Sequence, residues 1–463
     1  MQRGILIERR CQQPCSFLRG LLRRNVLALL KCVLIDYSYR NNHYPKALIA
    51  RASFPRQMAI SMRKIVVNEL HQVPLKKQAI EIVERKGLGH PDYICDSIMN
   101  EISVALSREY KKKLGHIAHH NIDKGLLVAG KTEGRYGGGI IKKPMLLVFG
   151  DRATFEVGKD RIEVDKIAVD TAKNWLKTKL RFVDPEKHVT YQVEIKPGSA
   201  ELTDIFERKA RFLGANDTSA AVGYAPLTPT ESLVLEMERY LNSSDFKKRF
   251  PESGEDTKVM ALRRNDLLEM TISMAFVDRF IKSESDYFSK KESIFEELRN
   301  FVESKSSISK IELNLNTLDI KGRGLSGIYT TVTGTSAEEA DSGEVGRGNR
   351  ANGIVSLNRP SSSEAAAGKN PVSHVGKIYN LLSFRIADRI VREVSGIDEA
   401  YVWLLSRIGI PIDQPAIASA QLILPETTRI QDVTPGARDI LDDELGNLNK
   451  FCDDLAEGKV PVC

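Results

Sequence analysis

Apolar residues first fall into a regular pattern in the part of the chain that follows Pro91. They recur at helical spacing, and the row comprises Ile94, Ile98, Ile102, Leu106, Tyr110 and Leu114. Side chains three or four positions apart share one face of a helix, so this row predicts an amphipathic helix over about 92–114. Pro91 suits the first turn of that helix, and Gly115 suits its end.

Beyond this helix, segments with strand character alternate with segments with helical character. The expected strands are 125–130, 145–150, 189–195, 311–315, 328–332 and 400–405, with another near 259–261. The expected helices are 164–180, 231–241, 292–302, 375–394 and 436–450, and a helical run starts at Glu201. Such interleaving favours an α+β or α/β class. The spacing is compatible with three similar β/α blocks, although the sequence contains no clear repeat.

The segment from Gly334 to Pro371 has almost no apolar periodicity and many Gly, Ser, Asn and Arg residues. A loop this long inside a compact domain is usually functional or disordered. Its charges are varied rather than repetitive, which favours a functional loop. A solvated, disordered loop is the alternative.

Charge changes this picture mainly at the N-terminus. The composition, 42% hydrophobic and 28% charged, is ordinary for a globular chain, and 463 residues suffice for roughly two to four domains. The net charge is +7, but residues 1–62 carry eleven Lys and Arg against two acids, which leaves residues 63–463 at −2. The body therefore lacks the basic excess of a nucleic-acid-binding protein. No uncharged apolar stretch is long enough to span a membrane.

Residues 1–61 thus form a basic extension ahead of a body over 62–463. An Arg-rich, acid-poor extension is typical of a transit peptide. We favour the alternative, an upstream extension before a natural start at Met62, where the sequence reads MRKIVVNEL. The six cysteines include no CxxC pair, which indicates a reducing compartment, and we expect a cytoplasmic protein.

The string ERKGLGHPD, residues 84–92, is the first candidate for chemistry. His90 precedes the predicted helix, whose free N–H groups attract anions. Asp92 and Asp96 lie four residues apart on one helical face, and paired carboxylates can hold Mg²⁺ beside a polyphosphate. The alternative is an ordinary helix start with acids that offset the helix dipole.

Two short turns are weaker candidates. KPGS, residues 196–199, follows a predicted strand, and its Gly-Ser turn suits phosphate or ribose oxygens, or a simple helix cap. In GANDTS, residues 214–219, Asp217 is either a buried partner for a substrate ammonium or the start of an Asx turn.

The long segment supplies fixed cations, since Arg347, Arg350 and Lys369 lie among glycines that let the backbone approach a phosphate. It is not a P-loop, because the Gly-x4-Gly-Lys-Ser/Thr string is missing. The string GRGLSG at 322–327 matches GxGxxG, but a strand rather than a helix is expected after it, so we discount dinucleotide binding. His119 and His120 lack metal-site spacing and are expected to pack structurally.

Together these strings are far more specific than each is alone. ERKGLGHPD, HHNID, KPGS, ANDTS, GEVGRGNR and AGKNPVSHVGKIYNLL resemble, in this order, the archaeal-type S-adenosylmethionine synthetases. The similarity runs from about Met62 to the C-terminus. It implies three similar α+β domains with pseudo-threefold symmetry and a homodimer with shared active sites. The implied reaction is attack of the methionine sulfur on C5′ of ATP, with hydrolysis of the displaced triphosphate to pyrophosphate and phosphate. Mg²⁺ and K⁺ are the implied cofactors.

The resemblance also assigns roles to single residues. Catalytic roles fall to His90, Lys369 and Arg350. ATP and its phosphates are expected at Gly198, Ser199, Arg347, Arg350 and Lys369. Contacts to methionine or adenosine are expected from Asp217 and Asp341. Metal binding is expected from Asp92, and monovalent-cation binding from Asp123.

Two strings depart from the family pattern. The chain has Glu339-Ala-Asp-Ser-Gly343 in place of Met-Gly-Asp-Asp-Gly, and Arg359-Pro-Ser-Ser-Ser-Glu364 in place of Arg-Pro-Met-Ser-Met-Glu. Asp341 and Glu364 are retained, so we expect activity. A triphosphatase that has lost methionine binding and a non-catalytic nucleotide-binding subunit are the alternative functions.

Overall fold

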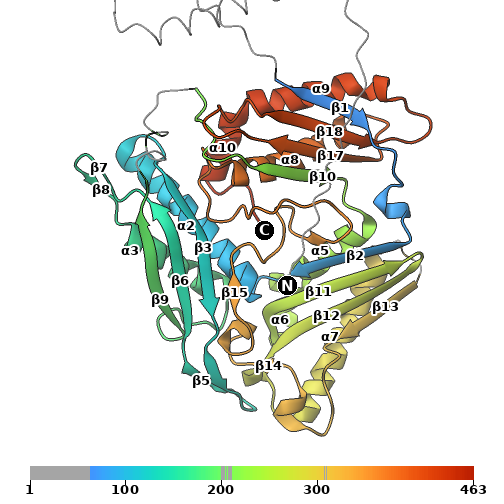
Figure 1. Cartoon of the computed structure of the whole chain (residues 1–463). Helices are drawn as coiled ribbons and strands as arrows, with labels where there is room; N and C mark the ends of the chain where they lie inside the picture. Colours follow the sequence, from blue (N-terminus) through green and yellow to red (C-terminus); the bar gives the residue numbers. More distant parts are fainter. Residues whose placement is uncertain (1–62, 200–203, 205, 207–210, 307, 309) are drawn as a thin grey trace, which may run out of the picture. The chain divides into compact units, whose positions relative to one another are not determined.

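The computed structural model describes residues 63–463 apart from 200–203, 205, 207–210, 307 and 309. The basic extension and most of the helical run expected from Glu201 lie outside the described residues. Within the described part, the strands form three larger sheets and two small hairpins, and helices pack on each larger sheet (Figure 1). No helix among these residues is both long and apolar enough to cross a membrane.

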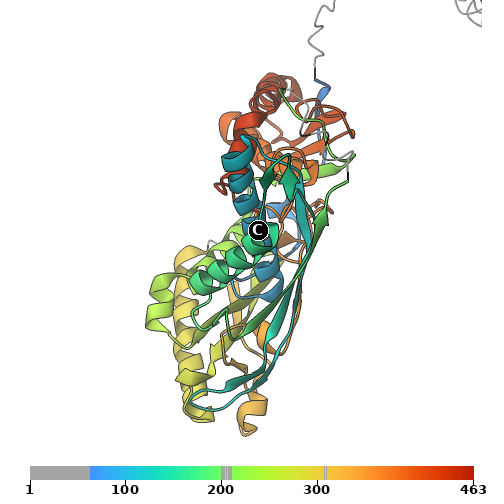
Figure 2. The ribbon, with the colours of Figure 1, turned by 90° about the vertical axis from the view of Figure 1, so that its left-hand side faces the viewer.

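The first sheet has the strand order β15–β3–β6–β9. Its strands are β3 (His120–Val128), β6 (Met145–Ala153), β9 (Val189–Pro197) and the short β15 (Gly343–Glu344). Helix α2 (Pro91–Leu114) packs on β3, and α3 (Val164–Lys179) packs on α2 and β9. The edge-on view shows α3 on one side of these strands (Figure 2). The two hairpins extend this part of the fold, as β4 (Lys131–Glu133) with β5 (Ile140–Lys143) and β7 (Glu156–Val157) with β8 (Asp160–Arg161).

The second sheet has the order β13–β12–β11–β2–β16, and β14 also pairs with β12. Its strands are β2 (Ile80–Lys86), β11 (Ser253–Arg264), β12 (Leu267–Val277), β13 (Lys310–Leu315), β14 (Thr330–Thr331) and β16 (Val355–Ser356). The helices of this part are α5 (Pro229–Leu241), α6 (Ser244–Arg249) and α7 (Glu284–Lys305). A separate buried cluster, which includes Val259, Met270 and Leu298, fills the space between the helices and the sheet.

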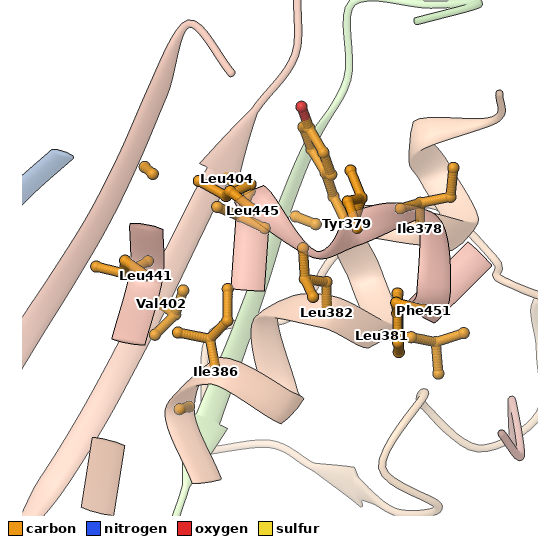
Figure 3. Packing of buried hydrophobic residues seen from close by; sticks show 14 of the residues in the cluster. Ile378, Tyr379, Leu381, Leu382, Ile386, Val402, Leu404, Leu441, Leu445 and Phe451 are labelled. Atoms are coloured by element: carbon orange, nitrogen blue, oxygen red, sulfur yellow. The ribbon is translucent and has the colours of Figure 1, made fainter. Parts of the chain in front are cut away.

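The third sheet, β1–β18–β17–β10, joins the two ends of the described chain. Its strands are β1 (Ile65–Glu69), β10 (Ala220–Ala225), β17 (Glu399–Leu405) and β18 (Ile417–Ile423). Strand β1 runs parallel to β18, whereas β17 is antiparallel to both of its neighbours. The helices here are α8 (Val375–Glu393), α9 (Ile430–Gly446) and α10 (Leu448–Ala456). Leu382 and Ile386 of α8 meet Val402 of β17 and Leu441 of α9 in the core (Figure 3).

Most elements expected from the sequence are confirmed. Helix α2 has Pro91 at its first position, and Gly115 ends it in the left-handed region at φ 77°. The strand expected at 328–332 is much shorter, because only Thr330 and Thr331 pair with β12. The helix expected at 436–450 is two helices, α9 and α10, and α9 begins at Ile430 and continues through Pro435. Buried apolar side chains along α9 compensate for the hydrogen bond that Pro435 cannot donate.

The segment from Gly334 to Pro371 is largely irregular, as expected. Its regular elements are the two-residue strands β15 and β16 and one turn of 3-10 helix, Ser336–Glu338. Much of the segment is nevertheless buried. This burial excludes the alternative of a solvated loop.

Candidate active site

His90 is the N-cap residue of helix α2, and its imidazole ring caps the N-terminus of the helix. His90 Nδ1 accepts a hydrogen bond from the Asp92 N–H at 3.2 Å. Burial of the ring, followed by the nearby Lys86 ammonium, lowers the pKa of His90 to about 4. The ring is therefore neutral at pH 7, and because Nδ1 is an acceptor, the proton resides on Nε2. His90 thus offers an N–H donor rather than a fixed positive charge.

The carboxylate of Asp92 is buried and has one partner at each oxygen. Lys86 Nζ lies 2.9 Å from Oδ2, and the Glu344 N–H donates to Oδ1 at 2.9 Å. Among the described residues, no three His, Cys, Asp or Glu side chains converge on a point where they could hold a metal ion. Mg²⁺ commonly takes one or two carboxylates and completes its shell with water and phosphate oxygens. Asp92 fits such a site as a single protein ligand beside a polyphosphate.

A cavity of about 540 Å³ opens beside His90. Asp341, one of the expected substrate contacts, lies in the same wall as His90, so the structure brings these two predicted residues together. The wall also contains Asp256, Lys258 and Tyr329, which the sequence did not single out. The cavity therefore combines a ring N–H, carboxylates, an ammonium and an aromatic face.

Asp256 and Lys258 reach this cavity because β11 pairs with β2. The pairing places Lys258 directly opposite Lys86. Asp256 is buried, and its Oδ2 accepts hydrogen bonds from the N–H and the hydroxyl of Ser336 at 2.8 and 2.5 Å. Burial raises the pKa of Asp256 to about 6 despite these bonds. No short motif surrounds either residue, so only the strand pairing could have revealed them.

Arg347 and Arg350 belong to the long segment, but their side chains have different surroundings. Arg347 is exposed, and its backbone N–H closes a turn onto the Glu344 carbonyl at 3.3 Å. Arg350 lines a second cavity of about 120 Å³, together with Tyr224 and Ser356. Its Nη1 donates a long hydrogen bond of 3.4 Å to the Gly346 carbonyl. The structure thus places the two arginines near each other along the chain but against different surroundings.

Lys369 is buried beside β3, where its ammonium bridges two carboxylates. Nζ lies 2.6 Å from Asp123 Oδ2 and 3.0 Å from Glu364 Oε2. Burial acts to raise the pKa of Asp123, but Lys369 and then neighbouring hydrogen bonds hold that pKa well below its usual range. Gly368 precedes Lys369 at φ 74°, and a Cβ there would lie 2.1 Å from the Ile122 carbonyl oxygen, so only glycine allows this approach.

Strand β3 connects the two groups of residues. Gly368 and Lys369 lie against Ile122 and Asn121 at its start, while β15 pairs with Leu126 and Leu127 near its end. Ile122 and Leu126 are four residues apart, which is about 13 Å along a strand, so Lys369 and the loop that leads to Arg347 contact the same strand at roughly that separation. The long segment therefore contacts β3 at two places, once through Lys369 and once through β15, which precedes Arg347.

The remaining predicted residues lie apart from these two groups. Gly198 is half-buried and Ser199 exposed, directly after β9. Asp217 is exposed, which contradicts a buried carboxylate. Its Oδ1 accepts from the N–H of the next residue, Thr218, at 2.6 Å, whereas an Asx turn would use the amide two residues on. The physical reason is that the Asp217 carboxylate is hydrogen-bonded within its own loop, while the neighbouring Asn216 lines a small cavity together with His374.

Two motifs that the sequence analysis discounted as functional sites have structural roles. His119 and His120 are buried, and His120 Nε2 lies 2.9 Å from the Ser103 hydroxyl. The amides of Gly322, Arg323 and Gly324 in the GxGxxG string all donate to Glu284 Oε1, at 2.9 to 3.1 Å. A carboxylate of the chain thus fills the place that a phosphate would take.

Comparison with known proteins agrees with the resemblance seen in the sequence. The family model for S-adenosylmethionine synthetase (AdoMet synthetase) matches residues 63–459. The S-adenosylmethionine synthase of Methanothrix thermoacetophila is 47% identical over 399 residues, which cover 86% of this chain and 99% of that protein. The S-adenosylmethionine synthase of Thermococcus onnurineus is 45% identical, over 88% of this chain and 100% of its own length.

A solved structure supports the fold. An unusual S-adenosylmethionine synthetase from Campylobacter jejuni superposes with a TM-score of 0.50 and 17% identity, over 83% of this chain and 95% of that chain. The family model covers most of the sequence, and the relatives match over nearly their whole length. The chain is a member of the S-adenosylmethionine synthetase family.

Proposed function

We propose that the chain makes S-adenosylmethionine from ATP and methionine in the cavity beside His90. The observation that carries this placement is the shared wall of His90 and Asp341, next to the buried Asp92 and the Arg347 turn. A well-formed cavity with convergent polar groups is the default location for a substrate. Tyr329 and the neighbouring apolar wall would accept the adenine ring, and the polar side would face the ribose and phosphates.

The reaction requires no nucleophile from the protein, because the methionine sulfur attacks C5′ of ATP. The enzyme has to align the sulfur with C5′ and stabilise the charge that develops on the departing triphosphate. The Nε2–H of neutral His90 is suited to donate to the leaving oxygen. Asp341 would contact the methionine or adenosine part, and Asp217 is a second candidate from its exposed loop.

Three cations are proposed to hold the triphosphate. Lys369, Arg347 and Arg350 belong to the same segment, and Lys369 lies against β3. Lys369 already binds two carboxylates, so the triphosphate would compete with Asp123 and Glu364 for its ammonium. The same cations would stabilise the triphosphate while water cleaves it to pyrophosphate and phosphate. Gly198 and Ser199 would line the nucleotide side.

Mg²⁺ and K⁺ are the proposed cofactors. Asp92 would hold Mg²⁺ together with phosphate oxygens, and the bound Mg²⁺ would neutralise charge on the triphosphate. For K⁺ the candidate ligand is Asp123, but both of its oxygens have protein partners, namely Asn121 and Lys124 at Oδ1 and Lys369 at Oδ2. A cation at Asp123 would therefore have to enter as Lys369 turns toward the triphosphate.

A homodimer with shared active sites is proposed from the outer face of the third sheet. Val66, Ser419 and Trp403 form one row across β1, β18 and β17. Val66 is 37% exposed and Trp403 36%, and Ser419 between them is a small side chain that is 8% exposed. Exposed apolar side chains on one face of a sheet suit a contact with a second copy of the same surface.

The remaining proposals concern the whole chain. Three sheets with their own helices and cores support three similar domains, and pseudo-threefold symmetry between them is the proposed arrangement. The match over residues 63–459 supports a body that starts near Met62, after a separate extension. The free thiols of Cys95, Cys452 and Cys463 among the described residues support a cytoplasmic location.

The test is to incubate the purified chain with ATP, Mg²⁺, K⁺ and labelled methionine. We expect labelled S-adenosylmethionine together with equal amounts of phosphate and pyrophosphate. Phosphate without the sulfonium product would indicate a triphosphatase and would point to the changed string Glu339–Gly343. ATP binding without any turnover would indicate a regulatory subunit instead.

A further inference from the structure

The turn that carries Arg347 is fastened to its surroundings from both sides. On one side, the N–H groups of Glu344 and Gly346 donate to Asp92 and Asp96 on α2, at 2.9 and 2.8 Å. On the other side, Asn349 exchanges two hydrogen bonds with the backbone of Lys86 on β2, at 2.9 and 2.8 Å. Arg347 lies between these attachments, at the end of a turn that otherwise has no regular structure.

The spacing of the two carboxylates matches the spacing of the two amides. Residues four apart on a helix have Cβ atoms about 5–6 Å apart. Alternate amides of an extended chain are about 6.5 Å apart, which is nearly the same separation. Asp92 and Asp96 can therefore receive alternate amides of the segment only when it lies along α2 in one register.

Asp96 differs from Asp92 in what else it touches. Asp92 also binds Lys86, whereas no Lys, Arg or His nitrogen among the described residues lies within 4 Å of the Asp96 carboxylate. Asp96 is only 3% exposed. A Cβ at Gly348 would lie 2.1 Å from Asp96 Oδ2, so the segment closes over the carboxylate from this side as well. No substrate or metal ion can reach Asp96 without displacement of the segment.

We infer that Asp96 is a positioning residue that fixes the Arg347 turn against the helix that carries His90 and Asp92. The inference rests on the proposed role of Arg347 as a triphosphate cation. A buried carboxylate that accepts only backbone amides is stabilised by those amides and by little else, which makes the contact specific for this segment. Burial raises the pKa of Asp96 to about 7, as expected for such a site. Displacement of a catalytic group by about 1 Å can lower a rate about 100-fold.

The experiment is a double-mutant cycle on the full chain, with Asp96→Asn and Arg347→Ala. The asparagine keeps an oxygen for one amide but presents an NH2 group where the carboxylate has its second oxygen. We expect Asp96→Asn to lower kcat about 10- to 100-fold with little change in the KM values for ATP and methionine. Since Asp96 acts through Arg347, the double variant should be no slower than Arg347→Ala by more than about threefold.

Glu344→Gln is the matched control, because it removes an exposed carboxylate from the same turn and leaves the backbone N–H to Asp92 in place. We expect it to retain wild-type kcat. Thermal unfolding of every variant identifies loss of structure, and Asp96→Ala provides a second test of the contact.

Rate losses that multiply in the double variant would overturn the inference, because Asp96 would then act independently of Arg347. Wild-type kcat in Asp96→Asn would overturn it too. If Arg347→Ala itself turns over normally, the role of Arg347 fails and this inference fails with it. Absence of S-adenosylmethionine formation by the wild-type chain is a separate result, which concerns the proposed function alone.

Discussion

Replacement of Lys369 by methionine removes one ammonium that holds two carboxylates and, in the proposed function, the triphosphate. The side chains of Lys369 and Asp123 are 3% and 7% exposed, so this is a buried ion pair. Loss of one partner from such a pair costs about 3–5 kcal/mol of stability. Lys124 still contacts Asp123 from the solvent side, which favours the lower end of that range. Loss of one fixed donor to the transition state costs about 10²–10³ in kcat, or about 2.7–4 kcal/mol.

The structure offers a way to separate these two effects. Asp123→Asn combined with Lys369→Met removes both charges of the pair, so stability should return toward the wild-type value. Turnover should stay low, because the triphosphate still lacks its cation. Chemical denaturation measures the first quantity, and formation of labelled S-adenosylmethionine measures the second.

Lys124→Ala is the control for charge near Asp123. The Lys124 side chain is 66% exposed, so its removal should cost at most about 1 kcal/mol and leave kcat near that of the wild type. Turnover of Lys369→Met within a few-fold of the wild type would refute the reasoning. Recovery of turnover in the charge-neutral double variant would also refute it, because Lys369 would then have only a structural role.

Three further predictions concern the metal, pH and assembly. Asp92→Asn should raise the Mg²⁺ concentration for half-maximal activity by about 10-fold or more, and an unchanged Mg²⁺ titration would contradict the assignment. Burial lowers the pKa of His120 to about 3, so its contribution to stability is complete above pH 6.5 and is lost as the pH falls toward about 3. We expect the free energy of unfolding in urea to fall between pH 7 and 5 by up to about 1.4 kcal/mol per pH unit more in the wild type than in His120→Asn. The same pH dependence in both proteins would show that His120 does not titrate in this way. Trp403→Glu should convert the proposed dimer to monomer in light scattering, because a charge would be buried in an apolar contact, and a dimer of undiminished stability would place the interface elsewhere.

Elements with a strong local signal could be predicted from the sequence. The row of isoleucines in α2, with Pro91 before it and Gly115 after it, was sufficient for both ends of that helix. Strand β12 was missed, although it is a central strand of the second sheet. Its apolar residues first alternate and then become continuous, and such a run does not distinguish a buried strand from a buried helix.

The candidate site was predictable only where its chemistry is concentrated in short strings. His90, Asp92 and Lys369 lie in such strings. His90 and Asp92 stand at the helix start that the sequence predicted, whereas the ion pair of Lys369 with Asp123 was not predicted. Asp256 and Lys258 became visible only when β11 was paired with β2, a contact between segments distant in the chain. The exposure of Asp217 was also unpredictable, because a small-residue loop can turn its carboxylate either inward or toward its own backbone.

Strand β1 pairs with β18, so the third sheet combines residues made early in synthesis with residues made near its end. At about 5–20 residues per second, the ribosome needs roughly 20–70 s to make the chain between them. For that time β1 is a strand without its neighbour, and its unpaired edge can associate with other nascent chains. The order of the chain therefore makes this protein dependent on completion of synthesis, and we expect ribosome-stalled fragments that end before Ile417 to require chaperones.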